Sequence, residues 1–250
     1  MCVACWICGG LAATAEHKYK KSDTVRGHGK GPYKGDGSVS HYCEGKESKV
    51  QGPDANVLKY HKSLCAKCNN ETTQPFDKAY EQFISWIFKN ECNVLRDRKI
   101  NFETIYSSEW ETAQLNLYKY LVKAFGCKIV EAQAPVPLDL INFLRQESFQ
   151  TGLRIIISVN EIAMLMDKEH YDGLLRGSEF VAWPTVDRSQ ISHARWDSGV
   201  SWLTFEYWYG IVPPDGYEGD IWAADRGDVC LGNKPVTNKI RDLFNSGMSK

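Results

Sequence analysis

Residues 5–10 read CWICGG and residues 65–68 read CAKC, and these two stretches decide the fold of the first part of the chain. Each places two cysteines at the C-x-x-C spacing with which two thiolates grip one metal ion. Gly9 follows the first pair and permits the positive φ that a tight zinc knuckle requires. We therefore predict one structural zinc site with four thiolate ligands: Cys5, Cys8, Cys65 and Cys68.

The remaining cysteines do not extend this pattern. The chain has nine cysteines, and Cys2 is in C-x-x-C register with Cys5 but is not followed by glycine, so it is expected to be spare. The first residues lack the basic start and long apolar stretch of a secretory signal. No apolar run approaches the ~18 residues of a membrane span. These features favour metal over disulfides and predict a soluble cytoplasmic protein without membrane contact. A cluster of reduced buried thiols is the alternative.

Charge is distributed unevenly along a chain of ordinary globular composition. Hydrophobic residues make up 43% and charged residues 24% of its 250 residues, which fits one large domain or two small ones. The net charge is −1, yet residues 1–70 hold 11 Lys and Arg against 6 Asp and Glu. A basic N-terminal part predicts a surface that faces a polyanion. A solvated lysine-rich loop region explains the same charge.

The order of expected elements predicts an α+β fold in two parts. Residues 1–92 are expected to form a zinc module, with a zinc turn and short polar strand or loop over 1–25 and a Gly/Lys-rich loop or hairpin inserted at about 26–56. An amphipathic helix is predicted over 74–90. Residues 93–250 are expected to form an accessory α+β domain with an antiparallel sheet.

The accessory domain is expected to begin with helices and continue with strands. A helix over 109–125 opens with the capping box Ser108 and Glu111 and stops at Gly126, and another covers 137–146. Strands are predicted at 153–159, 179–183, 191–196 and 200–211, and a last helix near 237–245. The aromatic stretch 202–209 is expected to be core rather than a surface that stacks on bases.

Residues that suit chemistry lie next to the predicted zinc ligands. Glu16 and His17 lie between the cysteine pairs, and Asn69 directly follows the second pair. Because one zinc site pins both segments together, these side chains are expected to surround one point. A carboxylate and an amide oxygen suit Mg²⁺, which keeps several waters. A neutral imidazole beside that ion can take a proton from water that attacks phosphorus.

These motifs resemble the zinc-containing HNH (ββα-metal, treble-clef) endonucleases. The resemblance covers residues 5–90 and is closest to bacterial proteins described only as HNH endonucleases, which share strings such as TAEHKYKKSD and LCAKCNNETTQPFD. It implies an N-terminal treble clef and hydrolysis of phosphodiesters, in DNA above all, by a single Mg²⁺ or Mn²⁺ ion. It also implies that His17 is the general base and that Glu16 and Asn69 hold the catalytic ion, with Asn70 as the fallback.

Two features keep other functions open. Many relatives have Asp where this chain has Glu16, so a zinc-dependent module that binds nucleic acid without cleaving it is an alternative. The acidic, aromatic remainder favours contact with protein, including self-association, and a protein-interaction domain with structural zinc is a further alternative. The residues expected to contact nucleic acid are basic and follow His17 or lie in the insertion: Lys18, Lys20, Lys21, Lys30 and Lys34.

Overall fold

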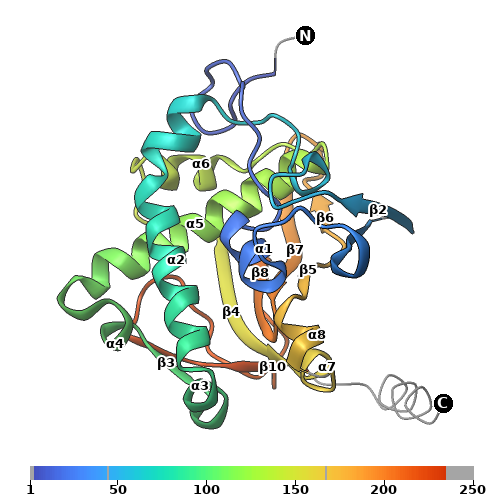
Figure 1. Ribbon diagram of the computed structural model, residues 1–250. Helices are drawn as coiled ribbons and strands as arrows, with labels where there is room; N and C mark the ends of the chain where they lie inside the picture. Colours follow the sequence, from blue (N-terminus) through green and yellow to red (C-terminus); the bar gives the residue numbers. More distant parts are fainter. Residues whose placement is uncertain (1–2, 44, 167, 235–250) are drawn as a thin grey trace.

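A six-stranded sheet with two long helices on one face organises the chain (Figure 1). The computed structural model describes residues 3–43, 45–166 and 168–234. The described helices are α1 (Lys21–His28), α2 (Gln74–Lys89), α3 (Glu91–Asp97), α4 (Phe102–Tyr106), α5 (Trp110–Glu131), α6 (Leu138–Leu144), α7 (Glu161–Met164) and α8 (Lys168–Asp172). The described strands are β1 (Val39–Cys43), β2 (Lys46–Val50), β3 (Lys99–Asn101), β4 (Leu153–Asn160), β5 (Leu175–Gly177), β6 (Val181–Pro184), β7 (Ile191–Val200), β8 (Leu203–Tyr209), β9 (Asp228–Cys230) and β10 (Gly232–Lys234).

The main sheet is largely antiparallel, as expected for residues 93–250. Its strand order is β10-β4-β8-β7-β5, and β6 also pairs with β7. Every pair in it is antiparallel except β10 with β4. Two small sheets accompany it, the β1–β2 hairpin and the β3–β9 pair. The mixed α+β class predicted from the sequence is confirmed, and the hairpin lies inside the predicted insertion at 26–56.

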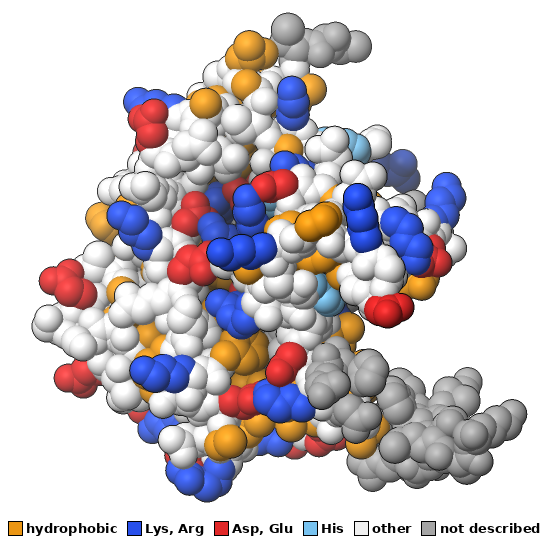
Figure 2. Space-filling view, viewed as in Figure 1, with side chains coloured by type: hydrophobic (Ala, Val, Ile, Leu, Met, Phe, Trp, Pro, Cys, Tyr) orange, Lys and Arg blue, Asp and Glu red, His pale blue; other side chains and the backbone are white. Residues whose placement is uncertain are grey.

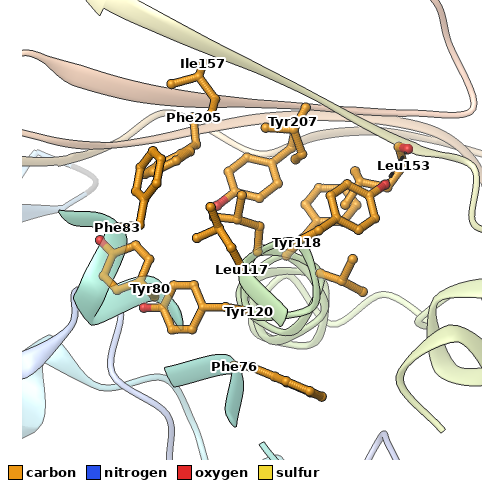
Figure 3. Packing of buried hydrophobic residues seen from close by; sticks show 14 of the residues in the cluster. Phe76, Tyr80, Phe83, Leu117, Tyr118, Tyr120, Leu153, Ile157, Phe205 and Tyr207 are labelled. Atoms are coloured by element: carbon orange, nitrogen blue, oxygen red, sulfur yellow. Dashed lines mark hydrogen bonds between the residues drawn. The ribbon is translucent and has the colours of Figure 1, made fainter. Parts of the chain in front are cut away.

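Aromatic side chains join helices α2 and α5 to strand β8 (Figure 3). The apolar stripe predicted for 74–90 faces inward, since Tyr80 stacks on Tyr120 of α5 with ring centroids 4.1 Å apart. Phe83 lies against Phe205, and Phe125 of α5 stacks on Tyr207 at 5.5 Å. Large rings that face one another across a helix–sheet interface bury much apolar area, which stabilises this layer order.

Strand β8 is buried on both faces, so the prediction that 202–209 is core is confirmed. Tyr207 faces α5, while Trp208 points to the other side and meets Tyr217 with ring centroids 5.3 Å apart. Glu206 is fully buried there and accepts a hydrogen bond from Ser158 Oγ. Thr204 and Glu206 show that a central strand covered on both sides can also bury polar side chains, and Glu206 is hydrogen-bonded there.

One helix was not predicted, and one predicted helix has different ends in the structure. Residues 21–28 form α1 where a strand or loop was expected, because buried Asp23 accepts a hydrogen bond from Tyr80 and docks the segment on α2. Helix α5 begins at Trp110 without a cap from Ser108 and runs through Gly126 to Glu131. The predictions for 74–90 and 137–146 agree with α2 and α6. The helix expected near 237–245 lies outside the described residues.

One hydrophobic core crosses the expected boundary near residue 92. Cys5, Phe76, Phe125 and Leu231 belong to the same cluster of buried residues. The part of the chain that holds the cysteine pairs therefore packs on the remainder through apolar contacts. Within 3–43, 45–166 and 168–234, no helix is long and apolar enough to cross a membrane.

Helix α5 continues through Gly126, and the missing side chain there leaves space for the indole ring of Trp6. A Cβ at Gly126 would lie 2.4 Å from the nearest ring carbon. We expect Gly126→Ala to lower the free energy of unfolding by about 1–2 kcal/mol, since overpacking outweighs the gain in helix propensity. Urea unfolding measures this change. In a Trp6→Ala background the same substitution should be neutral or stabilising. Equal destabilisation in both backgrounds would contradict the close packing.

Candidate functional site

The sulfurs of the four predicted zinc ligands converge on one point. Those of Cys5, Cys8, Cys65 and Cys68 lie within 4.8 Å of one another. Four thiolates around zinc at about 2.3 Å place their sulfurs about 3.8 Å apart. The Cys8 and Cys65 Sγ atoms lie 3.6 Å apart, so the donor set fits this geometry. The four cysteines are close enough to bind a metal such as zinc.

Backbone amides favour the thiolate form of Cys8, whereas burial raises the pKa of the Cys5 and Cys68 thiols. Gly9 has φ of 76°, as predicted for the residue after the first pair. The Gly10 N–H lowers the pKa of the Cys8 thiol to about 7, and the Cys68 N–H donates to Cys65 Sγ at 3.3 Å. Metal binding requires deprotonated cysteines, so these amides prepare the site for its ion.

A short antiparallel pairing carries Glu16 and His17 away from the cysteines. The segment 13–18 pairs with 58–64, with bridges at Thr14 to Leu64 and His17 to Lys59. The Tyr60 N–H donates to the Glu16 carbonyl at 2.9 Å. Side chains alternate along such a segment, so Glu16 faces the helices while His17 faces the opposite side.

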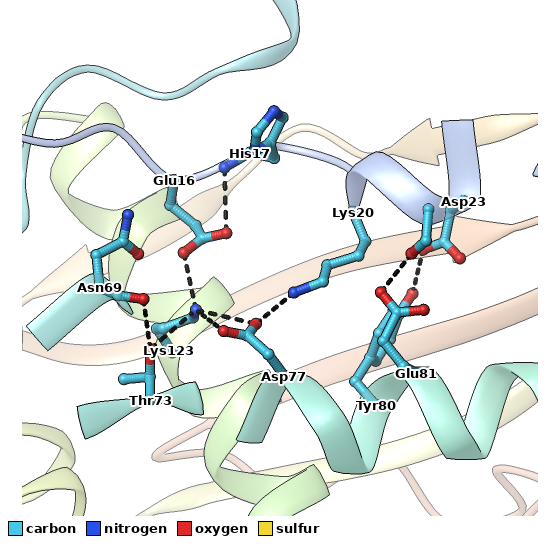
Figure 4. Close-up of polar contacts among 11 residues, drawn as sticks. Glu16, His17, Lys20, Asp23, Asn69, Thr73, Asp77, Tyr80, Glu81 and Lys123 are labelled. Carbon is cyan, nitrogen blue, oxygen red and sulfur yellow. Dashed lines mark hydrogen bonds and ion pairs between the residues drawn. The ribbon is translucent and has the colours of Figure 1, made fainter. Parts of the chain in front are cut away.

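The Glu16 carboxylate is held by a buried lysine (Figure 4). Lys123 of α5 places its Nζ 2.8 Å from Glu16 Oε2, and its side chain is 1% exposed. The same Nζ lies 3.3 Å from Asp77 Oδ1, which also accepts from Lys20 at 2.6 Å. The other Glu16 oxygen accepts the His17 N–H.

This cluster balances its own charge. Two carboxylates, of Glu16 and Asp77, face two ammonium groups, of Lys123 and Lys20. Burial alone lowers the pKa of Lys123, but the Glu16 and Asp77 carboxylates raise it above its ordinary value. Lys123 is therefore charged, and a buried charge of this kind persists only when it is paired.

His17 presents an imidazole nitrogen without a hydrogen-bond partner. Its Nε2 is buried and makes no hydrogen bond among the described residues, although Asp54 Oδ1 lies 3.4 Å away. Burial is the main reason why the pKa of His17 is lowered. The ring is therefore neutral near pH 7 and able to accept a proton.

Asn69 also ends in an unpartnered oxygen. Its side-chain Oδ1 is buried without a hydrogen bond, while its backbone carbonyl accepts from Thr73 Oγ1. Figure 4 shows the Asn69 side chain on the same side of the cluster as Glu16. Asn70, the alternative, is exposed. Cys68 thus fixes a turn that brings Asn69, not Asn70, to the Glu16 side.

The five lysines predicted to contact nucleic acid fall into two groups. Lys18, Lys20 and Lys21 pair with Glu131, Asp77 and Asp54, respectively. Lys30 and Lys34 are exposed, and neither forms an ion pair within the described part of the chain. Figure 2 shows Lys and Arg side chains, mixed with Asp and Glu, over α1 and the β1–β2 hairpin. The first group therefore orders the site as well as carrying charge.

Sequence reasoning missed Lys123, Asp77 and Asp54. A signal for Lys123 was present, because it interrupts the apolar stretch Leu121, Val122 and Phe125 inside a helix. A lysine in such a stretch is almost never fully buried without a partner. Its partner was not readable, since Glu16 is 107 positions earlier and only the fold joins them.

Comparison with known proteins identifies no relative: no family model, no curated protein and no solved structure matches the chain.

Loss of one zinc ligand should remove the metal and loosen the module. We expect Cys65→Ser to prevent the binding of one zinc ion per chain and to lower the free energy of unfolding by several kcal/mol. That is less than the ~10–16 kcal/mol of isolated zinc fingers, because an apolar core supports this module. Elemental analysis and urea unfolding measure both effects. Cys92→Ser, at an exposed cysteine, is the matched control. Full zinc content in Cys65→Ser would contradict the site.

Proposed function

We propose that the chain is an HNH-type endonuclease that hydrolyses phosphodiester bonds in DNA, with His17 as general base. The observation that carries this proposal is the His17 Nε2, which is buried without a hydrogen bond 3.4 Å from Asp54 Oδ1, on a segment that the cysteine cluster joins to the Asn69 turn. Neither folding nor binding requires a neutral buried imidazole at this point. In the proposed step, His17 takes a proton from water, the water oxygen bonds to phosphorus, and the bond to the 3′ oxygen breaks.

A treble clef accounts for the way in which the module is built. The first cysteine pair lies on a knuckle, and the second pair opens the turn that leads into α2. The β1–β2 hairpin lies between them in sequence.

Eight described cysteines are free thiols, which suits a reducing compartment, so we place the protein in the cytoplasm.

A divalent ion fits this site only after a rearrangement. Asn69 Oδ1 is a free oxygen ligand, but both Glu16 oxygens are engaged and the charges balance. Lys123 has Asp77 as a second partner, so its ammonium can release Glu16 and remain paired. When bound by Glu16 and Asn69, Mg²⁺ or Mn²⁺ would stabilise charge on the scissile phosphate.

The same ion pair favours one alternative, a zinc module that binds nucleic acid without cleaving it. A lysine that permanently occupies the cation position leaves no room for a catalytic ion. The basic surface over α1 and the hairpin serves binding in either case. The two functions therefore differ in whether Lys123 yields to a divalent ion.

Removal of Lys123 should reveal the competition between its ammonium group and a divalent ion for the Glu16 carboxylate. Lys123→Met leaves the Glu16 carboxylate without its ammonium partner, while Asp77 keeps Lys20, and this should lower stability by about 3–5 kcal/mol. Added Mn²⁺ should raise its melting temperature much more than that of the wild type, because ligand binding to the folded state stabilises it. Manganese binding is checked by electron paramagnetic resonance. The control Glu16→Gln/Lys123→Met removes charge from both positions and should lose the manganese effect.

Two results would contradict the ion site. One is a Lys123→Met protein that Mn²⁺ neither binds nor stabilises. The other is a manganese effect of equal size in the Glu16→Gln/Lys123→Met control, which would place the ion elsewhere.

Cleavage itself tests the general base. Wild-type protein should nick or linearise supercoiled plasmid with Mg²⁺ or Mn²⁺, and His17→Ala should lose about 10²–10⁴-fold in rate. His61→Ala is the matched control, because His61 is on the neighbouring segment with a side chain 82% exposed. Both variants should keep the wild-type melting temperature within a few degrees. Wild-type cleavage by folded His17→Ala would refute the proposed role.

A further inference from the structure

A groove runs between the β1–β2 hairpin and the segment around β5. It consists of two adjoining cavities of about 650 Å³ and 630 Å³. Tyr19, His41, Tyr42 and Gly177 line both, so the two form one continuous depression. Together the two cavities are larger than an ordinary pocket for one small molecule.

The groove contains an arginine, Arg176, whose charge interacts at longer range with Tyr19 and Asp197. Arg176 is half-buried, and its guanidinium donates to the Ser201 carbonyl and to Thr204 Oγ1. It forms no ion pair with any residue that the structure describes. Burial lowers its pKa to about 10, so it is charged at neutral pH. A guanidinium has five N–H donors in a fork that matches phosphate, and several of them remain free here.

Aromatic rings line the groove beside this charge. Tyr19 and His41 meet edge to face with centroids 6.3 Å apart. Tyr42 is 70% exposed and stacks on no other ring in the described chain. In the second cavity, Lys128 lies over the Trp196 ring at 6.0 Å. Glu131 and Glu179 also line that cavity, and Glu131 is neutralised by Lys18. The net lining is thus aromatic and cationic nearest Arg176.

One residue of the groove is close in sequence to the proposed general base. Tyr19, which lines both cavities, is two residues after His17. His17 itself lines neither cavity, and the chain bends at Lys18 and Tyr19. Through Tyr19, the groove therefore adjoins the segment that carries His17.

We propose that this groove binds single-stranded nucleic acid, with bases on Tyr42 and His41 and a phosphate on Arg176. The inference rests on the proposed function for its substrate class and deepens it, since it assigns a single strand rather than a duplex. Aromatic platforms beside cations are the usual means of holding single strands, because every base has a face that stacks. A duplex hides those faces inside its stack. A phosphate would give Arg176 the ion pair that it lacks among the described residues and would accept its remaining N–H groups.

Binding without cleavage tests the groove. A fluorescently labelled thymidine oligonucleotide of about 12 nucleotides is titrated by anisotropy without added divalent ion. Tyr42→Ala should weaken binding roughly tenfold, which is the effect of losing one stacked base. Phe149→Ala, at a residue 95% exposed elsewhere, is the matched control and should bind as wild type. Arg176→Gln should weaken binding at least as much and reduce its dependence on salt.

Each outcome tests binding in the groove independently of the proposed nuclease activity. Arg176 also has structural hydrogen bonds, so its variant counts only if its circular dichroism and melting temperature match wild type, whereas Tyr42→Ala changes an exposed side chain. Weakened binding by Tyr42→Ala alone supports the groove even if the protein cleaves nothing. Wild-type affinity in both folded variants, tighter binding to a duplex of the same sequence, or no binding at low salt would overturn it. None of these results alters the His17→Ala comparison, which measures cleavage.

Discussion

The cluster of four cysteines is the constraint on which the rest of the site depends. It joins segments 57 positions apart in the sequence, and the intervening chain has little apolar material to hold it in place. Once Cys5 and Cys8 meet Cys65 and Cys68, the pairing of 13–18 with 58–64 is the short path between them. That pairing fixes the faces toward which Glu16 and His17 point. In this way a small basic module acquires a defined geometry although it is too small to bury a large apolar core of its own.

A second constraint comes from the buried charge on α5. Lys123 is surrounded by apolar neighbours and is stable there only because Glu16 and Asp77 surround its ammonium. The ion pair works in both directions. It orients Glu16 next to Asn69, and it ties the zinc module to the helix layer at a defined register. Replacing such a pair by apolar groups is often neutral for stability, so the pair is better understood as specifying geometry than as adding free energy.

The sequence predicts what is local and misses what is made by long-range contact. The cysteine spacing, the apolar stripe of α2 and the buried strand β8 follow from short patterns, and the structure agrees with them. The prediction that α5 ends at Gly126 was wrong because glycine is found both at helix ends and where another group approaches a helix closely. Only the position of Trp6 distinguishes these two cases. Helix α1 has few apolar residues and forms because Asp23 meets Tyr80. The Glu16–Lys123 pair joins two regions that no spacing rule relates.

Residues beyond 92 therefore do more than accompany the zinc module. Trp6, between Cys5 and Cys8, rests on Gly126 of α5, and Arg145 donates to the carbonyl of Ile7 in the same turn. With Lys123 at Glu16, three contacts from the later part of the chain reach the short segment 6–16. A carboxylate displaced by one ångström would be less effective in proton transfer or metal binding, because both depend on distance. The helix layer is thus the scaffold that positions the candidate site, and the cysteine cluster attaches the basic hairpin surface to it.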